Sequence, residues 1–379
     1  MTVHVVTDSS SCLPKELAEQ AKVSVLDLHT DGEGADRTTA GLGALELTAC
    51  YARLLERGGD AGVVAIHLSK ELSATWSNAV SAAGIFDGKV RVMDTNTAGM
   101  VNGFAALKAA EIAQAGGSLE DCFRAAQRVI DESNLWLYVH RLDAIRKGGR
   151  LSTGQTLLTT ALAIKPILRL EDGRIALAAK TRTQGKAMDK LVNMVTEVVI
   201  EEATRAAVRG ESPRRIRVAV HENEAVDVAE KLIASMQERV EELRIHASSH
   251  DGPFAIPDGS EKKKERLILA KEKARIRDMV KAEKTKTEKV HTDKAKAQKV
   301  GTEQGKSGDH KDRSVGFQAV DASGVVQRDE TEAMESIAGT HYDPADIAIP
   351  DVEFSRIQIS DVLSVHTGPS SIAVTTVFW

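Results

Sequence analysis

The chain has 379 residues, of which 42% are hydrophobic and 3% aromatic, and a formal net charge of −5 at pH 7. At about 150 residues per domain, this length predicts two or three domains, and we interpret the chain as two domains plus an insertion. The small net charge gives no reason to expect nucleic acid as a partner. Because the sequence has no secretory leader and no apolar run of roughly 18 residues, we expect a soluble cytoplasmic protein.

The sequence offers no pattern for a metal or a nucleotide cofactor. Its three cysteines, Cys12, Cys50 and Cys122, form no Cys-x-x-Cys pair and fit buried thiols in a reducing compartment. The glycine pairs Gly32-x-Gly34 and Gly41-x-Gly43 lack the third glycine of a dinucleotide-binding loop. We therefore expect neither a metal site nor a cofactor.

The first part of the chain alternates short apolar runs with helix-length segments. Such spacing predicts parallel strands joined by crossover helices, and hence a parallel-sheet α/β/α domain over residues 1–150. The predicted strands are Val3–Val6, Val63–Leu68, Val90–Met93 and Leu135–Val139.

After Gly149 the pattern changes. A strand at Pro166–Leu170, a turn at Glu171–Gly173 and a strand at Arg174–Ala179 are typical of a hairpin. Further elements are predicted along the chain: a helix at Gln184–Arg205, a strand at Ile216–Val220, a helix at Ala225–Val240 and a strand at Leu243–His246. Together they predict a second, α+β domain with a largely antiparallel sheet, formed by residues 151–251 and 351–379.

Residues 252–350 have a different composition and are interpreted as a charged insertion. Residues 261–300 contain fifteen Lys and Arg against seven Asp and Glu. We expect a charged helix over Glu261–Ala282 that fades into disorder, acting as a solvated linker. The alternative is that Lys262–Arg277 contacts anionic lipid headgroups or an acidic partner, since each cation near a membrane contributes about 1 kcal/mol.

Polar residues follow the predicted strands at their carboxyl ends. Thr7, Ser9, Ser73, Asp94 and Thr95 all lie at such positions. Crevices at this edge of an open α/β sheet collect ligands. The hydroxyl of Ser73 also precedes a predicted helix, whose N-terminus favours an anion. For Ser9 and its neighbours, helix capping or turn formation is the favoured interpretation.

Four short motifs, spread over the whole chain, form a recognisable ordered set. They are Thr7-Asp8-Ser9-Ser10, Leu72-Ser73-Ala74-Thr75-Trp76, Lys147-Gly148-Gly149-Arg150 and His366-Thr367-Gly368-Pro369. Together they resemble the DegV family of fatty-acid-binding proteins, over roughly residues 1–250 and 355–379. The first and last motifs come from opposite ends of the chain, so we expect the two ends to meet at one site.

The resemblance implies a role for each matching residue. Thr39, Ser73 and His366, with Thr367 beside it, would hold the carboxylate of a bound fatty acid. Thr7, Ser9, Asp94 and Thr95 would belong to the same lipid-binding site, and Arg150 and Arg182 would face a partner protein. The chain departs from the family pattern at Ala74 and Trp76, where glycine and tyrosine are usual, and at Ala40 and Leu42, where serine and proline are usual.

The function that the resemblance implies is that of a lipid carrier and not of an enzyme. A long-chain fatty acid would lie in an apolar tunnel, because burial yields about 0.8 kcal/mol per methylene. A separate fatty acid kinase subunit would phosphorylate the exposed carboxylate to an acyl phosphate.

Two other functions stay open on the sequence alone. In an acyl hydrolase, Ser73 would be the nucleophile and His366 the base, although the chain has no Gly-x-Ser-x-Gly motif and Asp8 or Asp94 would have to orient the histidine. In an interaction protein, the basic segment 261–300 would make transient contact with a membrane surface.

Overall fold

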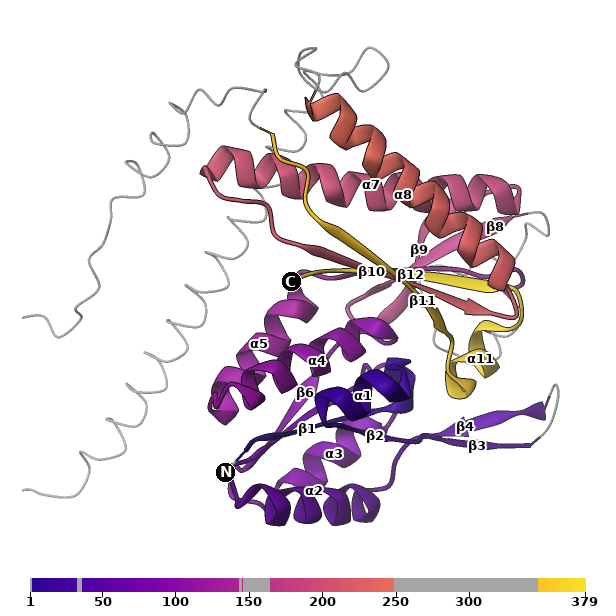
Figure 1. Cartoon of the computed structure of the whole chain (residues 1–379). Helices are drawn as coiled ribbons and strands as arrows, with labels where there is room; N and C mark the ends of the chain where they lie inside the picture. Colours follow the sequence, from indigo (N-terminus) through magenta and orange to yellow (C-terminus); the bar gives the residue numbers. More distant parts are fainter. Residues whose placement is uncertain (1, 33–35, 143–144, 146–163, 249–346) are drawn as a thin grey trace, which may run out of the picture. The chain divides into compact units, whose positions relative to one another are not determined.

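A computed structural model describes residues 2–32, 36–142, 145, 164–248 and 347–379. The chain divides into one unit of Met1–His250 with Asp346–Trp379 and a second of Asp251–Ala345. The predicted charged helix over Glu261–Ala282 and the rest of the second unit lie outside the described residues. The described part of the first unit contains two larger β-sheets with helices packed against them and one two-stranded sheet (Figure 1).

The first sheet has four parallel strands in the order β2-β1-β5-β6. Its strands are β1 (His4–Asp8), β2 (Val23–Leu26), β5 (Val63–His67) and β6 (Val90–Asp94). Helices α1 (Lys15–Ala21), α4 (Met100–Gln114) and α5 (Leu119–Asp131) share a core on one face, while α2 (Ala44–Gly58) and α3 (Thr75–Ala83) cover the other. Every residue of the central strand β5 is buried, because helices cover both faces. The predicted α/β/α layer is confirmed.

The second sheet has six strands in the order β11-β10-β12-β7-β8-β9. These are β7 (Asn134–Tyr138), β8 (Lys165–Glu171), β9 (Arg174–Thr181), β10 (Ile216–Asn223), β11 (Val352–Gln358) and β12 (Ser371–Phe378). Only the β10–β11 pair is parallel among them, so the largely antiparallel sheet is confirmed. Helices α7 (Gln184–Arg209) and α8 (Val226–Ser248) pack on one face (Figure 1).

Helix α4 lies between the two sheets. Val64 of the first sheet and Ala219 and Val377 of the second share one core with it. Small side chains on the buried faces of α4 allow this double packing, because they let both sheets approach the helix closely. Five of its fifteen residues are buried alanines: Ala105, Ala106, Ala109, Ala110 and Ala113.

Short elements at the edge of the first sheet bring the chain ends together, as expected. Strands β3 (His29–Asp31) and β4 (Thr38–Ala40) form an antiparallel pair of their own. Helix α11 (Asp361–Thr367) packs against this pair and against the 3₁₀ turn η1 (Ser9–Ser11) that comes directly after β1.

The prediction that Leu135–Val139 continues the parallel sheet is wrong. This segment is β7, which pairs antiparallel with β12 and β8 in the second sheet. Its residues are apolar on both faces, a pattern that suits an inner strand of either sheet. The partner that decides its place, β12, lies at the far end of the chain.

Two local predictions near the C-terminal half are also wrong. Leu243–His246 is not a strand, because α8 continues through it to Ser248 without a helix-breaking residue after Val240. The sequence around His366 predicts an apolar strand before the histidine and a Gly-Pro turn after it, but His366 lies in the last turn of the helix α11. That helix begins after Ser360 and ends at Thr367, just before Gly368, whose φ of 72° suits glycine.

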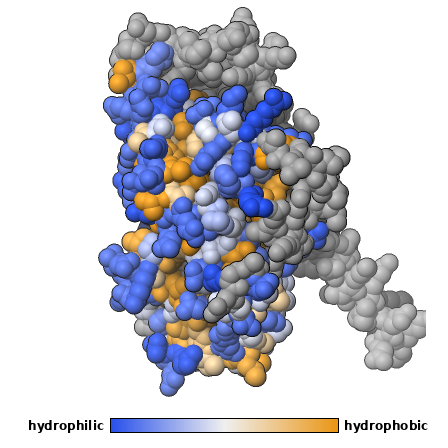
Figure 2. All heavy atoms as spheres, turned by 90° about the vertical axis from the view of Figure 1, so that its right-hand side faces the viewer, coloured by the Kyte–Doolittle hydropathy of each residue, from blue (hydrophilic) through white to orange (hydrophobic). Residues whose placement is uncertain are grey.

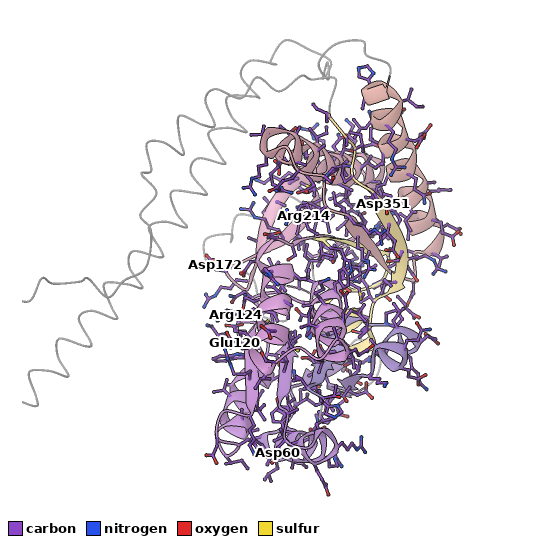
Figure 3. The ribbon with its side chains drawn as sticks, turned by 60° about the vertical axis from the view of Figure 1, so that its left-hand side comes forward. Asp60, Glu120, Arg124, Asp172, Arg214 and Asp351 are labelled. Carbon is purple, nitrogen blue, oxygen red and sulfur yellow. The ribbon has the colours of Figure 1, made fainter. Side chains whose placement is uncertain are left out.

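The described surface is charged and carries only scattered apolar side chains. Figure 3 shows Arg124 beside Glu120 on α5, where the guanidinium Nε donates to the carboxylate at 2.7 Å. On the face in Figure 2, hydrophobic residues form small groups surrounded by hydrophilic ones. Within the described ranges, no helix has the length and hydropathy to cross a bilayer.

Candidate functional site

A cavity of about 330 Å³ lies between the two sheets. This volume falls within the range of roughly 300–1,000 Å³ usual for small-molecule sites. Most of its wall is aliphatic: Leu28, Leu68, Leu72, Leu135, Leu137, Ile145, Leu168, Leu170, Ile175, Ile359, Val362 and Leu363. Aliphatic side chains cannot form hydrogen bonds with a polar ligand, so this part of the wall suits a hydrocarbon chain.

Four of the predicted site residues contribute polar groups to this cavity. Thr39 comes from β4, Ser73 precedes α3, and His366 and Thr367 end α11. Three separate segments therefore converge on one part of the wall. This convergence is what the sequence motifs predicted.

The polar groups are connected by short hydrogen bonds. Thr39 Oγ1 lies 2.9 Å from His366 Nε2. Ser73 Oγ lies 2.9 Å from Thr75 Oγ1 and accepts a hydrogen bond of 3.2 Å from the Thr75 N–H. The buried hydroxyl of Thr367 has no hydrogen-bond partner among the described residues. Hydroxyl and imidazole groups of this kind match a carboxylate, which accepts hydrogen bonds and needs donors when buried.

Gly41 permits the close approach of these segments. A Cβ atom at this position would lie 2.8 Å from Thr75 Oγ1 and 3.0 Å from Ser73 Oγ. The backbone after β4 can therefore touch the two hydroxyls only because residue 41 has no side chain. The sequence motif did not single out this glycine.

The other four predicted lipid-binding residues are not in the cavity wall. The Thr7 hydroxyl donates to the Ile66 carbonyl, the Thr95 hydroxyl donates to the His67 carbonyl, and Ser9 accepts a hydrogen bond from the Leu28 N–H. Asp94 pairs with Lys70 at 2.9 Å. In this structure these residues hold together the loops at the carboxyl edge of the first sheet.

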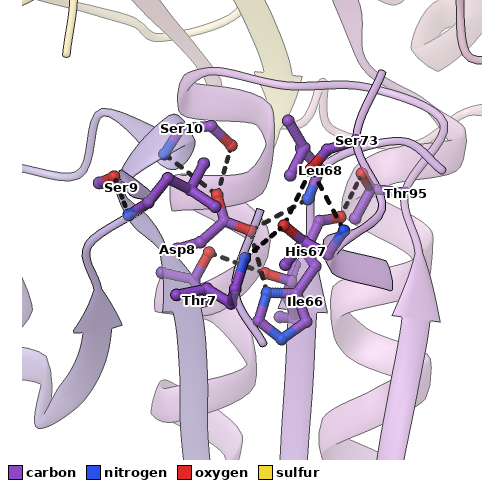
Figure 4. Close-up of polar contacts among 12 residues, drawn as sticks. Thr7, Asp8, Ser9, Ser10, Ile66, His67, Leu68, Ser73 and Thr95 are labelled. Atoms are coloured by element: carbon purple, nitrogen blue, oxygen red, sulfur yellow. Dashed lines mark hydrogen bonds and ion pairs between the residues drawn. The ribbon is translucent and has the colours of Figure 1, made fainter. Parts of the chain in front are cut away.

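A buried network that the sequence did not predict lies beneath these loops (Figure 4). The carboxylate of Asp8 accepts from the Ser10 N–H at 3.0 Å, from the Leu68 N–H at 3.2 Å and from His67 Nδ1 at 2.9 Å. His67 Nε2 lies 3.1 Å from the Tyr51 hydroxyl, and burial raises the pKa of that phenol. The network joins β1, β5 and α2, so it fixes the loops that carry the polar end of the cavity.

His221 is a further residue of the cavity that the sequence did not reveal. It lies on β10, lines the cavity and is 2% exposed. Its Nε2 accepts a hydrogen bond of 3.0 Å from the N–H of Met100 at the start of α4. Burial lowers its pKa to about 4, so the ring is neutral near pH 7. A single histidine in an apolar strand gave no signal that distinguishes it from an ordinary core residue.

The β8–β9 hairpin forms part of the wall and is attached to the first sheet at its tip. The Ser69 hydroxyl donates to the Gly173 carbonyl at 2.9 Å, and Arg174 Nε donates to Glu71 at 2.7 Å. Gly173 has a φ of 79°, and a Cβ there would meet Ser69 Oγ. These contacts hold Leu168 and Ile175 against the cavity.

The structure describes one of the two arginines that were predicted to face a partner protein. Arg150 lies outside the described residues. Arg182 comes directly after β9 and is exposed, away from the cavity wall. Among the described side chains, no group of three or more His, Cys, Asp or Glu is placed to hold a metal ion.

The chain is similar to known proteins in both sequence and fold. The family model described as "Uncharacterised protein, DegV family" matches residues 29–256. This chain belongs to the DegV family. A DegV domain-containing protein of Corynebacterium glutamicum, Cgl2349/cg2579, is 47% identical over 233 residues, which cover 61% of this chain and 81% of that protein.

Solved DegV structures share the fold. The crystal structure of Cg2579 from Corynebacterium glutamicum matches with a TM-score of 0.65 at 32% identity and covers 100% of this chain and 98% of that one. DegV from Bacillus subtilis, described as a fatty acid binding protein, matches with a TM-score of 0.61 at 21% identity and covers 100% of both chains.

Proposed function

We propose that this DegV protein binds a long-chain fatty acid in the cavity between its sheets. The carboxylate would accept hydrogen bonds from Thr39, Ser73 and His366, and the hydrocarbon chain would lie against the leucines and isoleucines of the wall. The observation that carries the proposal is one cavity whose wall is mostly aliphatic and in which Thr39, Ser73 and His366 lie close together. DegV proteins from Thermus thermophilus and Bacillus subtilis, described as binding fatty acids, support it.

Both parts of the cavity are needed energetically. Each buried methylene contributes about 0.8 kcal/mol, so the aliphatic wall supplies most of the affinity. A buried carboxylate without donors would cost several kcal/mol, on the order of the burial gain of a few methylenes. The hydroxyls of Thr39 and Ser73 and the imidazole of His366 would remove that cost.

We further propose that the protein is a carrier that presents the carboxylate to a separate kinase, which forms an acyl phosphate. The hydrogen bonds favour this over an acyl hydrolase, in which the serine nucleophile would pair with the histidine base. Here Ser73 bonds to Thr75, whereas His366 Nε2 bonds to Thr39. The exposed Arg182 is available for contact with the kinase.

Native mass spectrometry and lipid extraction of the purified protein test the binding step. The wild type should carry fatty acid, and a Ser73→Ala plus His366→Ala variant should lose it. Ser77→Ala is the matched control, since Ser77 lies exposed on α3, outside the cavity wall, and its hydroxyl donates to the Ala74 carbonyl at the start of the same helix. A wild type that stays empty and refuses added fatty acid would contradict the proposal.

The kinase step needs its own assay. Fatty-acid-loaded protein, ATP and extract of the source cells should together yield a hydroxamate when hydroxylamine traps the acyl phosphate. The loaded protein with ATP alone should yield none, because the catalyst is a separate subunit. Product formation by the purified protein alone would show that the chain is itself the enzyme.

A further inference from the structure

Thr75 occupies a position next to the polar end of the cavity where its hydrogen bonds can be counted completely. Its side chain is fully buried. Thr75 Oγ1 accepts from the Leu42 N–H at 3.3 Å and lies 2.9 Å from Ser73 Oγ. Ser73 Oγ in turn accepts from the Thr75 N–H at 3.2 Å. The direction of the hydroxyl–hydroxyl bond decides which proton is left for a ligand.

Only one direction leaves every buried donor with an acceptor. If Ser73 donated to Thr75, the Thr75 proton would have no acceptor among the described residues, at a cost of about 1–3 kcal/mol. If Thr75 donates to Ser73, both lone pairs of Ser73 Oγ are used, one by the Thr75 O–H and one by the Thr75 N–H. The Ser73 proton then has no protein acceptor in this cluster and is free to point into the cavity.

We propose that Thr75 is a positioning residue that makes Ser73 a hydrogen-bond donor toward an acceptor-only head group, a carboxylate. This inference rests on the proposed function, because it concerns the head group of the bound lipid. A carboxylate accepts from Ser73 in a charge-assisted bond, which is about twice as strong as a bond to a neutral oxygen. Thr75 thereby favours a fatty acid over the alcohol of equal chain length.

Gly41 completes the arrangement on the side of β4. A Cβ at residue 41 would press on both hydroxyl oxygens of the pair, at 2.8 Å and 3.0 Å. Gly43, two residues along, has no atom within 4 Å of the corresponding Cβ position and a φ of −77° that suits alanine. The chain therefore offers a matched pair of glycines for testing the geometry.

The test is a double-mutant cycle read out as the ratio of two dissociation constants, one for a fatty acid and one for the primary alcohol of the same length. The wild type should prefer the acid. Ser73→Ala and Thr75→Val should each lower this preference by about tenfold, the effect of one charge-assisted hydrogen bond. Because Thr75 acts through Ser73, the double variant should lose no more preference than Ser73→Ala alone.

Other variants separate this role from a general effect on folding. Thr75→Ser keeps the hydroxyl and should keep the acid preference. Gly41→Ala should lower the preference, and Gly43→Ala should leave it unchanged. These two variants also decide the matter if Thr75→Val does not fold.

Four results would overturn the proposal. Thr75→Val with undiminished acid preference, or a double variant whose losses multiply, would show that Thr75 does not act through Ser73. Gly41→Ala with wild-type preference would show that the hydroxyl pair does not set it. A wild type that binds neither lipid contradicts the proposed function itself, and the inference falls with it, whereas binding without the Thr75 effect refutes the inference alone.

Discussion

Replacing Glu202 by glutamine should destabilise the protein by about 3 kcal/mol at neutral pH. The Glu202 side chain is 1% exposed. Its carboxylate accepts hydrogen bonds from Arg205 Nη2 at 2.6 Å and from the Arg214 N–H at 2.8 Å, with further bonds from both guanidinium groups. Arg214, labelled in Figure 3, also stacks on Phe378, so the cluster joins α7 to the C-terminal strand.

The magnitude is set by the pKa of Glu202. Burial alone would raise this pKa, but the hydrogen bonds from Arg205 and Arg214 outweigh it and lower the pKa from 4.5 to about 2. A shift of roughly 2.5 units corresponds to about 3 kcal/mol at about 1.36 kcal/mol per unit. Because the folded-state pKa is lowered, this stability is present above pH 4.5 and is lost as the pH falls toward 2.

Urea unfolding of the wild type and Glu202→Gln at several pH values measures this contribution. The difference in unfolding free energy should be largest near neutral pH and should shrink in acid. Glu211→Gln is the control, since Glu211 is 55% exposed and pairs only with Arg205 among the described residues, so it should change stability by less than about 1 kcal/mol. A Glu202→Gln variant as stable as the control, or a difference independent of pH, would refute the reasoning.

Three more changes probe the cavity and the contacts that support it. Gly173→Ala should destabilise more than Gly116→Ala in thermal unfolding, because both glycines have φ near 80° but only a Cβ at Gly173 would meet a serine hydroxyl; equal losses would show that the hairpin tip is not held as described. Tyr51→Phe should cost about 1–3 kcal/mol in urea unfolding by leaving a buried nitrogen of His67 unpaired, and a neutral change would refute that bond. His221 has its pKa lowered from 6.5 to about 4, so unfolding free energy should fall as the pH drops through this window, and His221→Gln should flatten that slope. An unchanged slope would show that His221 does not titrate in this way.

Elements that depend on a local sequence pattern, such as an apolar run or a turn dipeptide, were predicted from the sequence. The buried parallel strands β1, β5 and β6 read as apolar runs because helices cover both of their faces. The β8–β9 hairpin was evident from its Asp172-Gly173 turn, where both residues have positive φ. Strand β7 was misplaced because its partner β12 is distant in the chain, and pairing across such a distance leaves no local signal.

The candidate site also contains residues that a local motif predicts and residues whose role depends on contacts distant in the sequence. The motif residues Thr39, Ser73 and His366 were predicted and meet in one cavity, and their role toward a bound ligand stays a prediction. Asp8 was visible as part of a polar motif and as a candidate partner of His366, but it bonds to His67, a contact that crosses from one strand to the next. The role of a polar residue inside an apolar strand depends on which side chains the fold brings next to it, and the local sequence does not contain that information.

A crystal structure with a fatty acid that carries bromine at its methyl end would test the central claim most directly, because anomalous scattering locates the bromine. The account predicts the bromine among the aliphatic residues between the sheets, and the carboxylate within hydrogen-bonding distance of Ser73 and His366. Bromine beside Ser73, or no bromine in the cavity at full saturation, would contradict it.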